Sequence, residues 1–413
     1  MIAAGLVPEE IAAVRERVRS RLAWDAAVTD AELRALIESE LFVLPHMRRL
    51  TSEERRAAVN RLYHSFRGLD ALQPLLDDPA VTEIMIVGHE RIFIEKNGRL
   101  QLAPLGFESR ERLEDLIQSI VGQVNRIVNE ASPIVDARLP DGSRVHVVLP
   151  PIALQGPTVT IRRFPSRPLG MDELVGLGAL SAEAAGLLRR LVGAKYNIFI
   201  SGGTGSGKTT FLNALAQWIP PDERIITIED AAELQIRGIP NLVSLETRNA
   251  NTEGKGRIGM RELIRASLRM RPNRIIVGEV RGEEALDMLQ AMNTGHEGSL
   301  STGHSNTARD MLSRLETMVL GGSELPVSVV RQQISSALDV IVHLSRLRDG
   351  TRRVVEISEI AGLRDGEVGL HPLYARDEGS GGLVAVGELH NVRKLAEHEK
   401  GAAGHDGLHR IHA

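Results

Sequence analysis

The sequence GGTGSGKT, from Gly202 to Thr209, matches the pattern G-x-x-x-x-G-K-[ST] at every fixed position. An apolar segment, residues 197–201, precedes it, and a segment with apolar residues on one helix face follows it. A glycine-rich turn between a strand and a helix is the setting in which this pattern binds phosphate. This feature constrains the chain most, because it requires a buried strand, a tight loop and a helix N-terminus at one edge of a sheet.

Each residue type in this loop has a chemical reason. Glycines let backbone N–H groups turn inward around phosphate oxygens, and the helix N-terminus adds the positive end of its dipole. Lys208 is expected to reach the β- and γ-phosphates, and Thr209 to hold Mg²⁺. The sequence therefore predicts a site for ATP and Mg²⁺. The expected nucleotide contacts in the loop are Gly203, Thr204, Gly205, Ser206, Gly207, Lys208, Thr209 and Thr210.

Strand-like and helix-like segments alternate between residues 172 and 397, which predicts a parallel sheet with helices on its faces and an α/β fold. The later segment DVIVHLSRLRDGTRRVVEISEI predicts a hairpin that turns at Asp349–Gly350. The strand-like segments are YNIFIS, RIITIED, LVSLET, RIIVGEV and GSLSTGH, and helices are expected to begin near Lys208, Met260 and Gly282.

Acidic residues lie at two of these strand ends: Glu229 and Asp230 in IITIED, and Glu279 in IIVGEV, where Gly278 stands in place of the usual aspartate. Parallel strands bring their carboxyl ends to one edge, so these acids should lie beside the glycine-rich loop. We expect Mg²⁺ to be held by Thr209, phosphates and water, with Glu279 or an acid of the other pair acting through water. One carboxylate, Glu279 or Glu229, should orient or deprotonate the attacking water.

The first half of the chain has a different pattern. Residues 1–67 are predicted to be helical, as a small bundle, a mobile arm or a module that docks a partner. Residues 68–165 combine strand-like segments with one helix, including a hairpin at Asn97–Gly98, and predict an α+β domain. Residues 166–171 are interpreted as a linker, and residues 398–413 as a disordered tail rich in glycine, alanine and histidine.

Composition excludes several other classes of protein. The 413 residues include no cysteine, which excludes disulfides, thiolate metal sites and cysteine nucleophiles. Aromatic residues make up 3% and the net charge is −4, so direct binding of nucleic acid is not expected. The chain has no apolar run of membrane-spanning length, and its N-terminus becomes charged too soon for a secretory signal. A cytoplasmic protein is expected, with any membrane association made through partners.

Several segments occur together in one order: SGGTGSGKTT, TIEDAAELQI, LRMRPNRIIVGEVRG, EALDMLQAMNTGHEGSLSTGHSN and RLETMV. Together they resemble the type II/type IV secretion ATPase superfamily, and most closely the Tad (Flp) pilus assembly ATPases of the CpaF group, over residues 68–362. By resemblance, TIEDAAEL is the Asp box, RIIVGEVRG the Walker B motif and TGHEGSLSTGH the His box. The absence of the Walker B aspartate is normal in this family.

The resemblance implies a PAS-like N-terminal domain at residues 68–165 and a RecA-like ATPase domain at residues 172–397, with nucleotide between them. It also implies a homohexameric ring at the inner face of the cytoplasmic membrane. Such a ring would power pilus subunit assembly or secretion together with an inner-membrane platform protein.

Two histidines in the His box, His296 and His304, could suggest a metal site. Eight residues separate them and no cysteine accompanies them, which does not fit common zinc patterns. In the resembling family these histidines lie near the nucleotide. They are therefore expected to sense the γ-phosphate or pass its signal to a neighbouring subunit.

Arginines of the N-terminal domain are the second group of residues that the resemblance points to, because the family uses them against the phosphates. Arg144 and Arg162 both fall on predicted strands, and Arg162 in TIRRF is the best match. Arg163 is the alternative, and the two neighbours point to opposite faces of a strand, so only one can contact phosphate. Arg248 and Arg257 flank a further loop near the expected site.

The function most consistent with these features is a Mg²⁺-dependent ATP hydrolase that drives Tad or type IV pilus assembly or related secretion. A second interpretation is a DNA- or protein-transfer ATPase of the same superfamily, with the same chemistry and a different partner. A third is a P-loop small-molecule kinase, although the sequence has no obvious acceptor pocket or lid and the His box would be unexplained.

Overall fold

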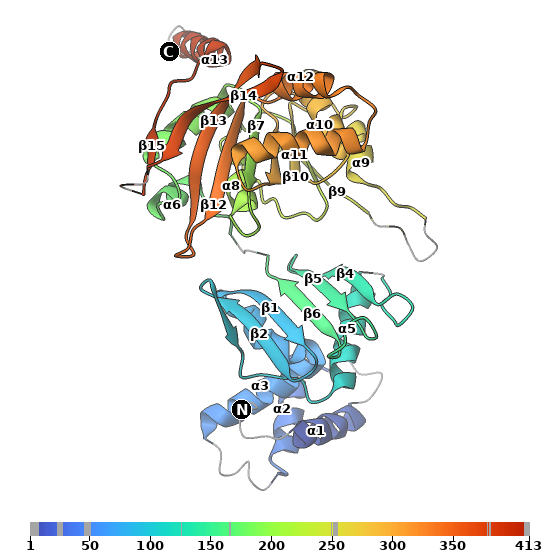
Figure 1. The fold of residues 1–413 in the computed structure, drawn as a ribbon. Coiled ribbons are helices and arrows are strands. Elements are labelled where there is room, and N and C mark those ends of the chain that lie inside the picture. Colours follow the sequence, from blue (N-terminus) through green and yellow to red (C-terminus); the bar gives the residue numbers. More distant parts are fainter. Residues whose placement is uncertain are drawn as a thin grey trace. The chain divides into compact units, whose positions relative to one another are not determined.

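The structure is a computed structural model that describes residues 8–22, 28–44, 51–124, 126–164, 167–248, 250, 255–377, 379 and 381–408. The chain forms two compact units, residues 1–165 and residues 166–413, each described here by itself (Figure 1). Within the described residues, no helix is long and apolar enough to cross a membrane.

Three helices begin the first unit: α1 (Pro8–Arg21), α2 (Asp30–Leu41) and α3 (Ser52–Arg67). Helices α2 and α3 each start at a capping box, in which a threonine side chain and a glutamate three residues later satisfy free backbone N–H groups. The three helices pack as a bundle with its own apolar core. That core contains Ile11, Val14, Val18, Leu33, Ile37, Leu41, Ala58, Val59 and Leu62.

A buried network of charges joins this bundle to the rest of the unit. Asp70 is fully buried and lies 2.6 Å from Arg112 and 3.1 Å from Arg61 of α3. Arg15 of α1 lies 2.5 Å from Glu108. The helical segment is therefore packed into a single compact unit with the α+β part, whereas the sequence analysis placed a boundary at residue 67.

The α+β part is a six-stranded antiparallel sheet in the order β3-β2-β1-β6-β5-β4. Helix α5 (Arg110–Gln123) covers one face through a shared apolar core. Asn97 and Gly98 both have positive φ, so the predicted hairpin turn is confirmed. The strands are β1 (Val81–Val87), β2 (Arg91–Lys96), β3 (Arg99–Leu102), β4 (Ile134–Arg138), β5 (Arg144–Val148) and β6 (Thr158–Arg162), with η3 (Asp70–Leu72) and α4 (Gln73–Asp77) before them.

The second unit is built on a nine-stranded sheet in the order β15-β14-β13-β12-β7-β11-β10-β8-β9. The strands from β12 to β9 in this order are parallel to one another, which confirms the predicted parallel α/β sheet. They are β7 (Ile198–Gly202), β8 (Ile225–Glu229), β9 (Leu242–Glu246), β10 (Arg274–Val280), β11 (Leu300–His304) and β12 (Val340–Arg346).

Helices cover both faces of this sheet and bury two apolar cores. One core unites the sheet with α6 (Met171–Gly176), α7 (Ala182–Gly193) and α8 (Lys208–Ala216). The other unites it with α9 (Met260–Ser267), α10 (Glu284–Asn293), α11 (Ala308–Gly321) and α12 (Val327–Ala337), which gather on one side of the sheet in Figure 1.

The antiparallel end of the sheet contains β13 (Arg352–Arg364), β14 (Glu367–Arg376) and β15 (Leu383–Ala385). The predicted hairpin at Asp349–Gly350 is present between β12 and β13. The chain then ends in α13 (Arg393–Leu408), where the sequence analysis expected a disordered tail from residue 398. Leu395 is buried in the core and Arg190 of α7 pairs with Glu399, so long-range contacts order this segment; residues 409–413 lie outside the described residues.

Candidate active site

The glycine-rich loop lies between β7 and α8, as the sequence predicted. Gly202 is required by close packing, because a Cβ at this position would lie 2.4 Å from the carbonyl oxygen of Leu344. Gly207 has φ +95°, a left-handed conformation that other residues rarely adopt. Helix α8 starts directly after it at Lys208, so the free N–H groups of its first turn face the loop. The local backbone is thus that of a phosphate cradle.

The side chain of Lys208 is folded into this cradle. Its Nζ donates a hydrogen bond to the carbonyl oxygen of Gly203 at 2.9 Å. The residue is 7% exposed, and burial lowers the pKa of its ammonium group. A buried cation with a single backbone partner is available to a polyanion, which is the role expected for Lys208.

His304 stands beside Lys208 because β11 is the neighbour of β7. The two strands are in register so that His304 lies opposite Gly202. His304 Nδ1 lies 3.4 Å from Lys208 Nζ, and its Nε2 lies 2.6 Å from Glu279 Oε1. The other oxygen of Glu279 accepts hydrogen bonds from Arg281 at 2.5 and 2.8 Å. We call Lys208, His304, Glu279 and Arg281 the P-loop network.

The tautomer of His304 follows from these contacts. Nδ1 faces an ammonium group and can only accept, so a neutral ring would carry its proton on Nε2, the nitrogen that faces Glu279. Burial lowers the pKa of His304, and the charge of Lys208 lowers it further, while Glu279 opposes the shift. The imidazole thus lies between Lys208 and Glu279 and is close to both side chains.

Glu229, the other candidate carboxylate, lies in a different environment. Its Oε1 accepts hydrogen bonds from the backbone N–H groups of Glu233 and Leu234 at 2.9 and 3.0 Å. Burial raises its pKa from the usual 4.5 to about 7. A Cβ at Gly278 would lie 2.7 Å from Glu229 Cγ, so the glycine at the usual aspartate position leaves room for this side chain. Glu229 thus supports the loop after β8, whereas Glu279 lies beside His304, the neighbour of Lys208.

His296 does not join the network. Its Nδ1 lies 3.2 Å from the carbonyl oxygen of Ala291, at the end of α10. It precedes β11, whereas His304 ends that strand, so the two histidines lie at opposite edges of the parallel sheet. The sequence analysis expected both histidines near the nucleotide. Within a single chain, only His304 lies at the glycine-rich loop. One metal ion cannot be bound by both, because a five-residue strand spans roughly 16 Å.

A family model described as "Type II/IV secretion system protein" matches residues 66–398, which include the whole P-loop network. The chain belongs to this family. The putative conjugal transfer protein Rv3659c of Mycobacterium tuberculosis is 37% identical over 316 residues, which are 75% of this chain and 89% of that protein. The type IV secretion system protein VirB11 of Brucella suis is 34% identical over 337 residues, or 74% of this chain and 91% of that protein.

Solved structures of this secretion ATPase family share the fold. The ATPase DotB of Legionella pneumophila aligns with a TM-score of 0.51 and 22% identity, covering 69% of this chain and 78% of that one. The pilus retraction motor PilT with bound ADP aligns with a TM-score of 0.51 and 19% identity, covering 83% of this chain and 89% of that one. Membership in this family implies nucleotide binding and ATPase activity.

The arginines that the sequence analysis selected lie on one face of the first unit's sheet. Arg144 and Arg162 are directly opposite each other on β5 and β6, and Arg162 also pairs with Glu83 at 2.9 Å. Arg163 instead donates hydrogen bonds to the carbonyl oxygens of Asp78 and Val81. Arg163 therefore holds its own domain together, and Arg162, with a 59% exposed side chain, remains available to a ligand.

A polar pocket of about 310 Å³ lies next to the Walker B strand. Its walls include Arg248 and Arg257, the arginines noted in the sequence, together with Arg281 and Asp230. Arg281 was missed by sequence reasoning. The spacing could have revealed it, because residues two apart at a strand end share one face, and Arg281 follows Glu279 by two.

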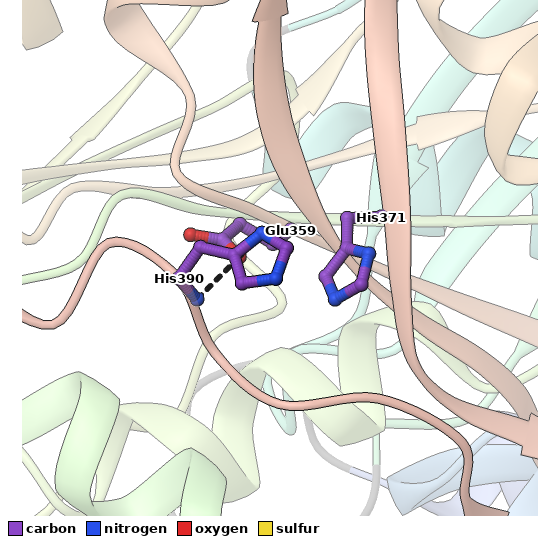
Figure 2. Close-up of side chains that lie close together, drawn as sticks. All are labelled: Glu359, His371 and His390. Carbon is purple, nitrogen blue, oxygen red and sulfur yellow. Dashed lines mark hydrogen bonds and ion pairs between the residues drawn. The ribbon is translucent and has the colours of Figure 1, made fainter.

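A second group of titratable side chains, Glu359, His371 and His390, lies on the antiparallel part of the sheet (Figure 2). The carboxylate of the buried Glu359 accepts hydrogen bonds from the backbone N–H groups of His390 and Asn391. The two imidazole rings stack at 4.0 Å, and His371 Nε2 lies 3.0 Å from the carbonyl oxygen of Glu388. Backbone groups thus already occupy both Glu359 oxygens and Nε2 of His371, and these contacts anchor the segment that leads into α13.

Proposed function

We propose that this secretion ATPase family member hydrolyses Mg²⁺-ATP at the P-loop network and converts the energy into movement of a pilus or secretion machine at the cytoplasmic membrane. The observation that carries the proposal is the contact sequence Lys208–His304–Glu279. It connects a phosphate-binding cation to a carboxylate that can position water. Thr209 would hold Mg²⁺, with Glu279 acting on it through water.

Phosphoryl transfer needs positive charge beyond Lys208, because negative charge spreads over the transferred phosphoryl group. We infer that Arg162, with Arg144 beside it, supplies this charge to a nucleotide bound in its own or a neighbouring subunit. The six-stranded sheet with α5 on one face is consistent with the PAS-like domain implied by the resemblance.

If each site is completed by the next subunit, the subunits contact one another head to tail. Such contacts satisfy every subunit only when the last one meets the first, which forms a closed ring. We therefore propose a homohexamer that docks on a platform protein of the inner membrane. The relatives named above favour a machine for conjugal transfer or type IV secretion, whereas the segment MLQAM, which starts at Met288, and the sequence ETRNANTEG favour Tad pilus assembly. Deleting the gene and scoring surface pili against macromolecular transfer separates these two roles.

The biochemical test measures phosphate release and mass photometry together. Activity per subunit should rise with protein concentration until a hexamer forms. Mixing Lys208→Ala subunits with Arg162→Ala subunits should restore part of the activity if the arginine acts on a neighbouring subunit. Full activity of a monomer at high dilution would refute the shared site. Phosphate release without any added acceptor also separates this function from a small-molecule kinase, which should largely lack it.

A further inference from the structure

The hairpin between β12 and β13 runs alongside the phosphate-binding loop. Strand β12 is the parallel neighbour of β7, and Leu344 lies opposite Gly202, the first glycine of the loop. Two residues further on, Arg346 of β12 lies directly opposite Arg352 of β13. Both arginines therefore extend beyond the end of β7, at the level of the loop.

Arg352 contacts the loop directly, and Arg346 lies close to it. Arg352 Nε donates a hydrogen bond to the carbonyl oxygen of Gly205 at 2.9 Å. The Cδ of Arg352 lies 3.4 Å from the position that a Cβ would take on Gly207, and Arg346 Nη1 lies 3.8 Å from the same position on Gly205. Gly205 and Gly207 are two of the residues whose backbone should surround phosphate. The two guanidinium groups are thus at the rim of the cradle.

Among the described residues, neither of these two arginines forms an ion pair with a carboxylate. Both are exposed. Like charges directly opposite on paired strands destabilise a hairpin, so this arrangement has an electrostatic cost that a bound anion would remove. Guanidinium groups are also well suited to phosphate, because they donate two parallel hydrogen bonds.

The strand order indicates which part of the nucleotide the arginines face. His304 and Glu279 lie on β11 and β10, on one side of β7, and the arginine hairpin lies on the other side. The γ-phosphate must lie toward Glu279 for water to attack it. The hairpin then faces the opposite end of the polyphosphate, where the α-phosphate and the nucleoside are.

We propose that Arg346 and Arg352 form a nucleotide-binding clamp that holds the α- and β-phosphates from within the same chain. This inference rests on the proposed ATP binding at the loop. The clamp acts on ATP and ADP alike, because both carry these two phosphates. It is distinct from an arginine that stabilises the transition state, which would act on hydrolysis and leave ADP binding unchanged.

The test compares ADP and ATP affinity, measured by calorimetry, with steady-state hydrolysis. Arg346→Gln is the decisive variant, because Arg346 makes no hydrogen bond to the loop that its removal would break. It should raise the Kd of ADP and of ATP by about 10-fold or more, the scale of a charge-assisted hydrogen bond. The loss should appear mainly in KM, with a smaller effect on kcat. Arg352→Lys keeps the charge but loses the fork, and should weaken ADP binding in the same direction.

Arg353→Gln is the matched control, because it removes the same charge from the next residue along β13, whose guanidinium lies against Gly178 instead of the loop. It should bind ADP as the unmodified protein does. Unchanged ADP affinity in Arg346→Gln would overturn the clamp, and so would a loss confined to kcat. Failure of the underlying ATP site looks different: the unmodified protein would bind no ADP, and Lys208→Ala would change nothing.

Discussion

His304 Nε2 lies 2.6 Å from Glu279 Oε1 at the edge of the sheet where β11 and β10 end. The other ring nitrogen of His304, Nδ1, faces Nζ of Lys208 in the glycine-rich loop at 3.4 Å. A change at the phosphate that moves Lys208 would therefore be felt at Glu279 through a single side chain. This relation gives the Walker B carboxylate a fixed orientation before nucleotide binds.

Replacing Glu279 by glutamine should separate binding from hydrolysis. Glu279→Gln keeps the size and polarity of the side chain but removes the charge that orients or deprotonates water. ATP should still bind, and hydrolysis should fall by roughly 10²-fold or more, the scale of losing a general base. Phosphate release and nucleotide binding measure the two quantities. Glu283→Gln, a nearby exposed carboxylate paired with Arg261, is the control. Normal turnover in Glu279→Gln would assign the water to Glu229.

Removing the imidazole of His304 should impair hydrolysis through Glu279. In His304→Ala the carboxylate loses its donor and Lys208 loses a neighbour, so turnover should fall by about 10-fold or more. His304→Gln retains one N–H donor and should recover part of the rate. Because His296 lies at the other edge of the sheet, His296→Ala should affect turnover less than His304→Ala does. Equal losses in both variants would contradict the placement described here.

Glu229 should make the stability of the second unit depend on pH. Its pKa is about 7 in the folded chain and 4.5 when unfolded, so the folded state holds the proton more tightly. The contribution of Glu229 to stability is therefore largest below pH 4.5, falls as pH rises from 4.5 to about 7, and is constant above that range. The free energy of unfolding, measured in urea, should be compared between the unmodified protein and Glu229→Gln. The difference between the two should shrink or reverse sign between pH 4.5 and about pH 7. A pH-independent difference would show that Glu229 titrates normally.

The charge network around Asp70 should stabilise the first unit. Arg61→Ala removes one of three cations that surround this fully buried carboxylate. The free energy of unfolding of this unit should fall by about 1–3 kcal/mol, the cost of leaving a buried polar group without its partner. This free energy is measured by unfolding the protein in urea while following hydrogen exchange of the backbone amides in α3.

The control for Arg61→Ala is Arg110→Ala, which breaks an exposed pair with Glu114 on α5. An exposed pair of this kind contributes little to stability, so the control should be nearly neutral. If Arg61→Ala were equally neutral, the bundle would be held to the sheet by apolar contacts alone.

Local signals in the sequence were sufficient for most elements of the second unit. The glycine-rich loop, the alternation of strands and helices and the turn at Asp349–Gly350 depend on neighbours in the chain, and each appears at the predicted residues. The same is true of the strand ends that carry Glu229 and Glu279. The elements β14, β15 and α13 were not predicted, because they are ordered by contacts with distant residues such as Glu359 and Arg190.

What the sequence alone determined is the chemistry of the site: a phosphate cradle, a lysine, two strand-end carboxylates and a histidine after them. The tertiary structure decided which of these side chains meet. Strand order placed β11 between β7 and β10, so His304 contacts both Lys208 and Glu279, while His296 lies at the far edge. Strand register likewise set Arg346 opposite Arg352 at the rim of the loop. Strand order and register arise from packing between segments far apart in the chain, and local residue patterns carry little information about them.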